Sequence, residues 1–190
     1  MTDVWERLAR YRHVKTLPNG ARLLLRPLSE EDKEGLVNLF ARATGEDLEY
    51  FRSDAGSRDV VESWVDNLDL KIVFPLVAIV DGKIVGDATL HFGERYHRHI
   101  AWVRIFLDHA YRRQGIGVLM LRCLIDIGRR VGLQQLYAEI VTTQPQVIKA
   151  FEDLGYRDEV TLRDYFVTDS GETLDMAIVV LRLVDHSGEF

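Results

Sequence analysis

Short apolar runs separated by polar turns fill the middle of the chain, and they predict consecutive strands. The runs at 74–80 and 84–92 flank Asp81-Gly82, a dipeptide that strongly favours a tight β-hairpin. A third apolar run, at 99–108, predicts another strand directly afterwards. Three strands in succession favour antiparallel pairing.

The first seventy residues mix helical and strand patterns. Residues 4–11 predict a short amphipathic helix, 17–20 predict a turn, and 21–28 predict a strand. Ser29 is a favourable N-cap for the next helix, because acidic residues follow it in the first turn. Residues 44–71 are mostly polar with scattered apolar positions and predict one or two short helices.

Helices and strands alternate in the second half of the chain. The pattern predicts a helix, a strand, a helix and a closing hairpin, at 116–131, 133–141, 145–155, 160–167 and 173–183. The strand–helix–strand unit around 100–141 predicts one parallel pair. The expected fold class is therefore α/β (α+β), with a mixed sheet and helices on its faces.

Composition and charge narrow the class of protein. Of 190 residues, 47% are hydrophobic and 28% charged, which is ordinary for a globular protein that builds one core. The net charge of −6 disfavours generic nucleic-acid binding. Cys123 is the only cysteine, which excludes an internal disulfide and a cysteine-based zinc site and fits a reducing cytoplasm. No apolar run is long enough for a membrane span, and the charged first residues do not resemble a signal peptide.

The segment YRRQGIG, residues 111–117, carries the most specific chemistry. It lies between a predicted strand and a predicted helix, where free N–H groups and the helix dipole favour an anion. Gly115 and Gly117 allow positive φ or a close approach, and arginine suits phosphate. The segment lacks the ending of a Walker loop, and it comes too late in the chain for a dinucleotide fingerprint. The alternative is a tight connection with solvated arginines, but two arginines at a helix N-terminus repel its dipole, which favours the anion site.

These residues resemble the GNAT family of N-acetyltransferases. The family's loop, [Q/R]-x-x-G-x-[G/A], matches RRQGIG at Arg112, Gly115 and Gly117. The flanking segments VRIFLDHAY and AEIVTTQPQVIKAFEDLGY are similar to the family's fourth strand and to its fifth strand and following helix. The closing LRDYFVTDSGETLDMAIVV resembles ribosomal-protein N-terminal acetyltransferases, and LPNGARLLLRPLSEEDKEGLVNLFARAT resembles bacterial protein-lysine acetyltransferases. The resemblance covers 20–184 as a single domain, with a helix and turn at 1–19 before it and a loose tail at 185–190.

The resemblance implies a fold and a cosubstrate. The implied fold has a central mixed, mostly antiparallel sheet of six to seven strands, helices on both faces, and splayed fourth and fifth strands. Acetyl-CoA would rest its pyrophosphate on backbone N–H groups of the loop, and its pantetheine arm would pair with the strand edge. No metal is implied. The implied cofactor-binding residues are Ile105, Phe106, Leu107, Arg112, Arg113, Gln114, Gly115, Ile116, Gly117 and Gln144, the last in place of a family asparagine.

Amide formation also needs a base, because most lysines and N-termini are protonated at pH 7. Some family members carry a glutamate early on the fourth strand, where this chain has no carboxylate. Others carry it on the fifth strand, at the position of Glu139, which is the predicted catalytic residue; the alternative is an ordinary exposed strand residue. His97 and His99 are reserves, since imidazole titrates in the right range. They could also bind a metal, but no third ligand is evident.

The resemblance assigns no residue of this chain as the acid that protonates the leaving thiolate. The family often has a tyrosine where this chain has Phe151, and phenylalanine cannot donate a proton. Water could serve, because a thiolate is a tolerable leaving group. Tyr137, Tyr156 and Tyr165 are the other donors considered.

Three functions remain open from the sequence. The first is an N-acetyltransferase that moves the acetyl group of acetyl-CoA to a protein lysine, an N-terminus or a small-molecule amine. The second is a non-catalytic acyl-CoA-binding sensor, which the missing tyrosine and fourth-strand glutamate support, and the third is a purely structural domain. The expected partners are acetyl-CoA, an amine-bearing small molecule or protein and a second copy of the chain. Neither nucleic acid nor membrane is expected, and the expected location is the cytoplasm.

Overall fold

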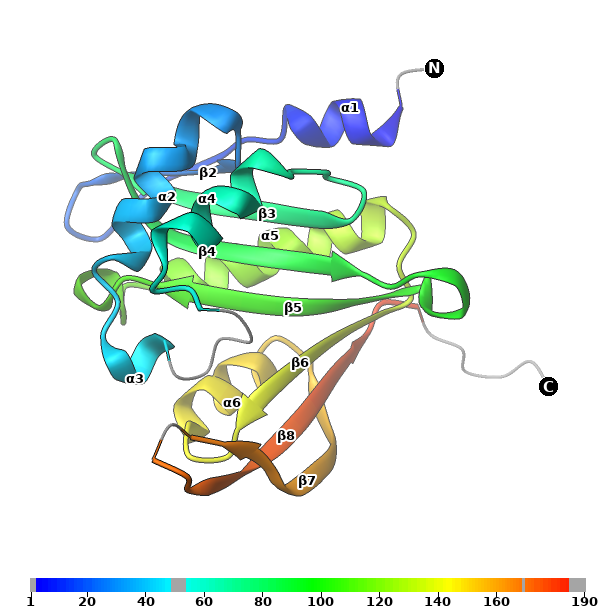
Figure 1. Ribbon diagram of the computed structural model, residues 1–190. Helices are drawn as coiled ribbons and strands as arrows, with labels where there is room; N and C mark the ends of the chain where they lie inside the picture. Colours follow the sequence, from blue (N-terminus) through cyan, green and yellow to red (C-terminus); the bar gives the residue numbers. More distant parts are fainter. Residues whose placement is uncertain (1–2, 49–53, 169, 185–190) are drawn as a thin grey trace. The chain divides into compact units, whose positions relative to one another are not determined.

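The computed structural model describes residues 3–48, 54–168 and 170–184, which form two compact units (Figure 1). The first unit holds the chain up to Leu90 together with Arg104–Leu124, and the second holds His91–Val103 and the chain from Ile125 onward. Strand β5 (Ile100–Leu107) and helix α5 (Ile116–Arg130) each contribute residues to both units. The expected tail at 185–190 lies outside the described residues.

The first unit is built on antiparallel strands. Hydrogen bonds connect its strands in the order β1-β2-β3-β4-β5, and β2 pairs antiparallel with both β1 and β3. Its other elements are α1 (Val4–Ala9), β1 (His13–Thr16), β2 (Arg22–Pro27), η1 (Glu30–Asp32), α2 (Lys33–Phe40), α3 (Gly45–Leu48), α4 (Arg58–Asp66), β3 (Val73–Val80), β4 (Lys83–Phe92) and η3 (His109–Tyr111).

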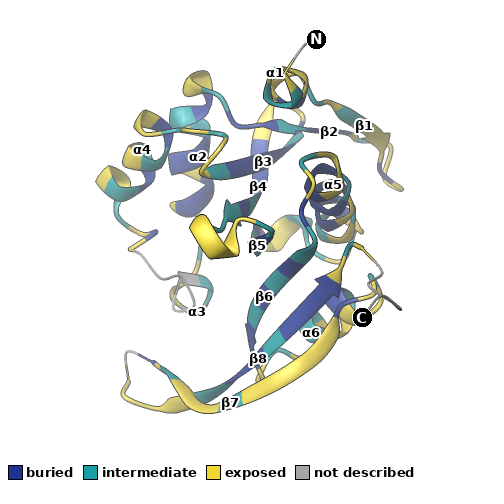
Figure 2. Ribbon diagram, turned by 90° about the vertical axis from the view of Figure 1, so that its right-hand side faces the viewer, coloured by how far each residue is buried: buried dark blue, intermediate teal, exposed yellow. Residues whose placement is uncertain are grey.

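Helices cover both faces of these strands, as Figure 2 shows. On one face, Phe40 of α2 stacks on Phe106 of β5 with ring centroids 5.1 Å apart, and it meets the edge of Trp64 of α4 at 5.3 Å. On the other face, a Cβ atom added to Gly86 would lie 3.2 Å from the sulfur of Met120 of α5. Burial of one large apolar side chain stabilises the fold by about 1.5–3 kcal/mol, so both faces contribute substantially.

The predicted cap before α2 is present. Asp32 accepts hydrogen bonds from the N–H and the hydroxyl of Ser29, at 2.8 and 2.9 Å. Arg26 binds the same carboxylate through two N–H groups, at 2.5 and 2.7 Å. Burial alone would raise the pKa of Asp32, but the hydrogen bonds from Arg26 and Ser29 outweigh it and hold that pKa below its usual value. The cap therefore fixes the start of the helix that carries Phe40.

The second unit contains the parallel pair that the sequence predicts. β5 pairs with β6 (Gln135–Val141) over Ile100–Trp102 and Gln135–Tyr137, and the ladder ends at Trp102 and Tyr137. β8 (Thr173–Arg182) pairs antiparallel with the whole of β6 and with β7 (Arg157–Val167). The unit also contains η2 (Arg95–His97) and α6 (Pro145–Glu152), which has Pro145 at its first position.

The predicted fold class is confirmed: the described residues form a mixed, mostly antiparallel sheet with helices. Asp81 and Gly82 have φ angles of 49° and 77°, as the predicted tight hairpin requires. The sheet has eight strands among the described residues, one more than the sequence predicts, and the addition is β1. β1 has four residues, none of them buried, so it leaves no apolar pattern to detect.

Candidate functional site

The segment between β5 and α5 folds into a turn with two left-handed residues. Asp108 caps η3, because its carboxylate accepts a hydrogen bond from the N–H of Ala110 at 3.0 Å. Arg113 and Gly115 then have φ angles of 59° and 78° and reverse the chain into α5. The fully buried Ile116 anchors the first turn of the helix. Left-handed residues close to a helix start are typical of backbone concavities that bind anions.

The backbone of this turn offers a row of donors. Among the described residues, no backbone N–H from Arg113 to Val118 has a hydrogen-bond acceptor. The following residue, Leu119, is the first to donate, to the carbonyl of Gly115 at 3.1 Å. Unpaired N–H groups at the start of a fifteen-residue helix attract negative charge. The anion site at 112–117 stays a prediction, and this row of donors is the observation that favours it.

The two arginines of the turn have different environments. The side chain of Arg112 is half-buried and held by two interactions: its Nε donates to the carbonyl of Leu107 at 3.0 Å, and its guanidinium forms an ion pair with Asp47 of α3. Burial alone would raise the pKa of Asp47, but the hydrogen bonds from Arg112 and Thr44 outweigh it and hold that pKa below its usual value. Arg113 is exposed. Arg112 therefore braces the turn, and Arg113 supplies the accessible cation.

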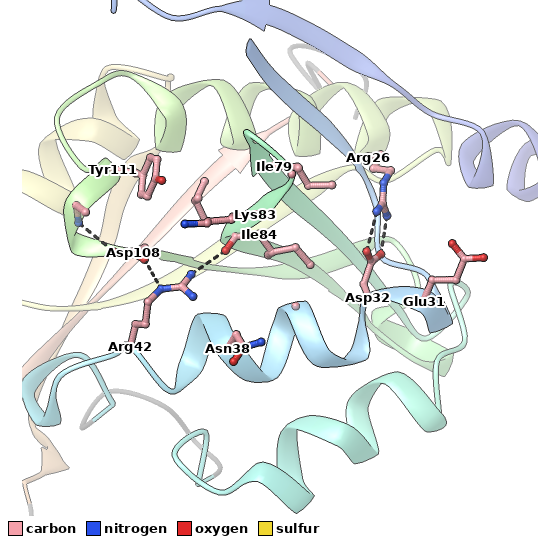
Figure 3. Close-up of a pocket in the computed structure, with 14 residues that line it drawn as sticks. Arg26, Glu31, Asp32, Asn38, Arg42, Ile79, Lys83, Ile84, Asp108 and Tyr111 are labelled. Atoms are coloured by element: carbon pink, nitrogen blue, oxygen red, sulfur yellow. Dashed lines mark hydrogen bonds and ion pairs between the residues drawn. The ribbon is translucent and has the colours of Figure 1, made fainter. Parts of the chain in front are cut away.

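A polar groove lies beside the start of the turn (Figure 3). It has a volume of about 730 Å³. Arg42 extends along it from the end of α2 and donates to the carboxylate of Asp108 at 2.7 Å and to the carbonyl of Ile84 at 2.9 Å. Arg42 thus connects β4 to the residue that follows β5. We therefore assign its side chain, which lines the groove, the structural role of holding the turn in place.

The strand edge predicted to hold pantetheine precedes the turn. Phe106 points into the core beside Phe40, whereas Ile105 and Leu107 are half-buried. A Cβ atom added to Gly117 would meet only the Cδ1 of Ile105, at 3.7 Å. The first unit thus places Ile105 beside the turn, with room for a Cβ atom at Gly117.

Glu139 and Gln144 both belong to the second unit. Glu139 lies in β6 opposite Ile178 of β8, on the half-buried face that it shares with Tyr137. Gln144 is the N-cap residue of α6, and its N–H donates to the carbonyl of Val141 at 3.0 Å. The role of each residue stays a prediction.

The tyrosines considered as proton donors differ in environment. Tyr137 donates its hydroxyl to the side chain of Gln135 at 2.6 Å, and Tyr165 is exposed. Tyr156 packs edge-on against Phe151 with ring centroids 4.9 Å apart, and its buried hydroxyl has no hydrogen-bond partner among the described residues. Burial raises the pKa of Tyr156, so it would transfer a proton to a thiolate only with difficulty.

We expect Tyr156→Phe to stabilise the protein. A buried hydroxyl without a partner costs roughly 1–3 kcal/mol, and the substitution removes only that oxygen. At this chain length each kcal/mol raises the melting temperature by roughly 2–4 °C, which calorimetry can measure. Tyr165→Phe, on an exposed side chain, is the matched control and should change nothing. A lower melting temperature for Tyr156→Phe would show that the hydroxyl is satisfied.

The histidines predicted as reserves lie near the start of β5. His97 ends η2 and its ring centroid lies 6.5 Å from that of Trp102, while the carbonyl of His99 accepts a hydrogen bond from the N–H of Gln134 at 2.7 Å. Within residues 3–48, 54–168 and 170–184, no group of three side chains is placed to hold a metal ion. In the same part of the chain, no helix is both long and apolar enough to cross a membrane.

Asp87 of β4 is a notable residue that the sequence analysis does not select. Its Oδ1 is buried and has no hydrogen-bond partner among the described residues. Burial raises the pKa of Asp87 to about 7. In the sequence, the sign that Asp87 could be buried is that it is an acidic residue inside the apolar run IVGDATL.

Known proteins resemble the chain in sequence and in fold. An alanine N-acetyltransferase of ribosomal protein bS18 from Escherichia coli is 33% identical over 67 residues, which are 35% of this chain and 45% of that protein. The chain therefore spans about 45% of the length of such relatives. Acetyltransferase PA5475 of Pseudomonas aeruginosa is 26% identical over 133 residues, which cover 66% of this chain and 69% of that protein.

Solved structures share the fold. The ribosomal-protein-S5-alanine acetyltransferase of Vibrio fischeri superposes with a TM-score of 0.77 at 19% identity, covering 87% of this chain and 96% of that one. The yncA protein of Salmonella typhimurium, solved with its cofactor acetyl-CoA, gives a TM-score of 0.75 at 21% identity over 87% and 96%.

The fold and the site together define a mixed-sheet protein whose strand-to-helix turn presents a row of unpaired backbone donors among the described residues. The model of the acetyltransferase (GNAT) family matches residues 36–156. The chain belongs to this family, as the turn RRQGIG and its flanking segments predict.

Proposed function

We propose that the protein is an acetyl-CoA-dependent N-acetyltransferase that acts on a primary amine. The acceptor would be a protein N-terminus, a lysine or a small-molecule amine. The unpaired N–H groups from Arg113 to Val118 are the observation that carries the proposal. When bound, acetyl-CoA supplies an acetyl group activated as a thioester.

The residues of the turn suit the pyrophosphate of that molecule. Successive backbone donors can bind several phosphate oxygens at once, and the start of α5 adds its dipole. The exposed Arg113 adds a positive charge. Ile105–Leu107 would hold the pantetheine arm through backbone hydrogen bonds, and Gln144 would add a contact from the start of α6. A backbone N–H of that edge could also stabilise negative charge on the thioester oxygen.

Glu139 is the proposed general base, directly or through water. It would take a proton from the acceptor's ammonium group, since only the neutral amine can attack the thioester. Water is the proposed acid for the thiolate, because Phe151 has no proton to give and the pKa of Tyr156 is raised. Only the assignment of water follows from a departure from the family pattern, namely Phe151 in place of a tyrosine.

A sensor that binds acyl-CoA without turnover is the second candidate. The buried Phe151, in place of a proton-donating tyrosine, favours it. Amine-dependent release of CoA by the wild-type protein would exclude this candidate.

The single buried Cys123 fits a reducing compartment, so we also propose a cytoplasmic location. A homodimer is a further proposal, which the molar mass in solution would test.

Thermal unfolding with and without acetyl-CoA tests the binding step. At a hundred times its dissociation constant, a ligand that binds only the folded state stabilises by about 2.7 kcal/mol. The melting temperature should then rise by roughly 5–10 °C. ATP and NAD, which also carry pyrophosphate, are the controls. A rise with either control and none with acetyl-CoA would contradict the proposal.

A further inference from the structure

Asp87 is an acidic residue in the middle of a largely buried strand, β4, and one of its carboxylate oxygens lacks a hydrogen bond among the described residues. Its neighbours Gly86 and Ala88 are buried, and the residue as a whole is half-buried. Its Oδ1 is inaccessible to solvent and has no hydrogen-bond partner in the part of the chain that the structure describes. Most buried polar atoms in native proteins are paired, so a charged group such as this carboxylate can gain a partner from outside the chain, either water or a ligand.

The direction of the Asp87 side chain follows from its neighbour. A Cβ atom on Gly86 would lie 2.9 Å from the Cδ1 of Leu107 and 3.2 Å from the sulfur of Met120, so Gly86 faces α5. Successive side chains of a strand point to opposite faces, which directs Asp87 to the side of α2 and α4. Phe106 is on that same side, because it stacks on Phe40.

The register places Asp87 beside the proposed cofactor edge. β4 and β5 run antiparallel in Figure 1, and the N–H of Asp108 donates to the carbonyl of Val85 at 2.8 Å. Counting along both strands from this bond puts Asp87 opposite Phe106. Side chains that lie directly opposite each other have Cβ atoms about 4.5–5.5 Å apart. Phe106 is the central residue of the edge proposed to hold pantetheine, so Asp87 lies on the strand next to that proposed edge.

The chemistry around Asp87 selects a cation. Burial raises the pKa of Asp87, and among the described residues no charged side chain contributes to that rise. An anion would be repelled by the carboxylate, and a neutral alcohol would offer a hydrogen bond without a charge. A primary ammonium group offers both, and the neighbouring aromatic ring of Phe106 can add a favourable contact with the cation.

We propose that Asp87 binds the ammonium group of the acceptor amine and positions its nitrogen for attack. This proposal rests on the proposed acetyltransferase function. It assigns acceptor binding to Asp87 and leaves proton removal to the base of the proposed reaction. That base takes one proton from the ammonium group, the nitrogen–carbon bond forms as the carbon–sulfur bond breaks, and the thiolate recovers a proton from water. The second amine proton leaves to solvent.

The first test uses n-butylammonium chloride as the probe, without acetyl-CoA. At matched ionic strength it should raise the melting temperature of the wild-type protein by roughly 2 °C more than the same concentration of 1-butanol. Asp87→Asn, which keeps the shape and removes the charge, should abolish the difference. Asp87→Ala serves if the first variant does not fold. Asp81→Asn makes the same chemical change on an exposed aspartate of the β3–β4 hairpin, so it is the matched control and should keep the wild-type response. Equal effects of butylammonium and butanol on the wild type, or an unchanged response in the Asp87 variants, would overturn the proposal.

The second test uses the best acceptor from an amine screen. Asp87→Asn should raise the acceptor KM at least about tenfold while kcat changes much less, because uniform binding is lost. The stabilisation by acetyl-CoA should match that of the wild type, which shows an intact cofactor site. A wild-type KM in Asp87→Asn, with acetyl transfer intact, would reject only the role of Asp87. A wild type that acetylates no amine but is stabilised by butylammonium would reject the proposed reaction and keep the cation site.

Discussion

Gly117→Glu should abolish acetyl-CoA binding while leaving the protein folded. A Cβ atom at this position meets only the Cδ1 of Ile105, at 3.7 Å, which is an ordinary van der Waals contact, so a side chain can start here without a clash. The new carboxylate would enter the space proposed for the pyrophosphate. Two like charges 4 Å apart repel by about 4 kcal/mol at an effective dielectric constant of 20. A loss of about 2.7 kcal/mol already weakens affinity a hundredfold, and titration calorimetry would detect that loss.

Two further variants at the same position separate charge from size. Gly117→Ala should bind nearly as well as the wild type, because the family loop accepts alanine there. Gly117→Gln has the size of glutamate without its charge, and its affinity should fall between those of the alanine and glutamate variants. An unchanged affinity in a folded Gly117→Glu protein would mean that CoA binds elsewhere.

Glu139→Gln should lower the rate of acetyl transfer by roughly a hundredfold or more at neutral pH, the usual contribution of a general base. Affinity for acetyl-CoA should be unchanged, since the substitution leaves the turn and the edge of β5 intact. The loss should shrink as pH rises, because the amine then deprotonates without help. Steady-state kinetics from neutral to alkaline pH would measure both effects.

Glu172→Gln is the control for this substitution. It makes the same chemical change on an exposed residue of the β7–β8 turn and should behave like the wild type. If Glu139→Gln keeps wild-type turnover across neutral pH, the base is a histidine, His97 or His99, or bulk water. If kcat falls equally at every pH, Glu139 contributes to positioning and not to proton transfer.

Local chemistry in the sequence determined most of the fold. Asp81-Gly82 encodes the hairpin through residues that accept positive φ, and Ser29 encodes the start of the helical segment through its hydrogen bonds with Asp32. β1 could not be predicted because an exposed four-residue strand depends on pairing with β2, and its own side chains carry no pattern.

The site was predictable where it depends on backbone conformation. Gly115 marks the turn because it adopts positive φ, and the motif could be read directly. The ion pairs Arg42–Asp108 and Arg112–Asp47 join residues more than sixty positions apart, so no local window contains them. The burial of Asp87 likewise follows from the packing of β5 and α2 against β4, which only the folded chain reveals.

The outermost strand of the second unit has a consequence for the protein at high concentration. β7 leaves one edge unpaired within the described residues, and its side chains are almost all exposed (Figure 2). Asp164 interrupts its pairing with β8 between Leu162 and Phe166, where the register shifts and φ reaches 50°. An irregular edge with charged side chains is a poor template for another chain. Concentrated solutions should therefore resist the formation of β-rich aggregates through this strand.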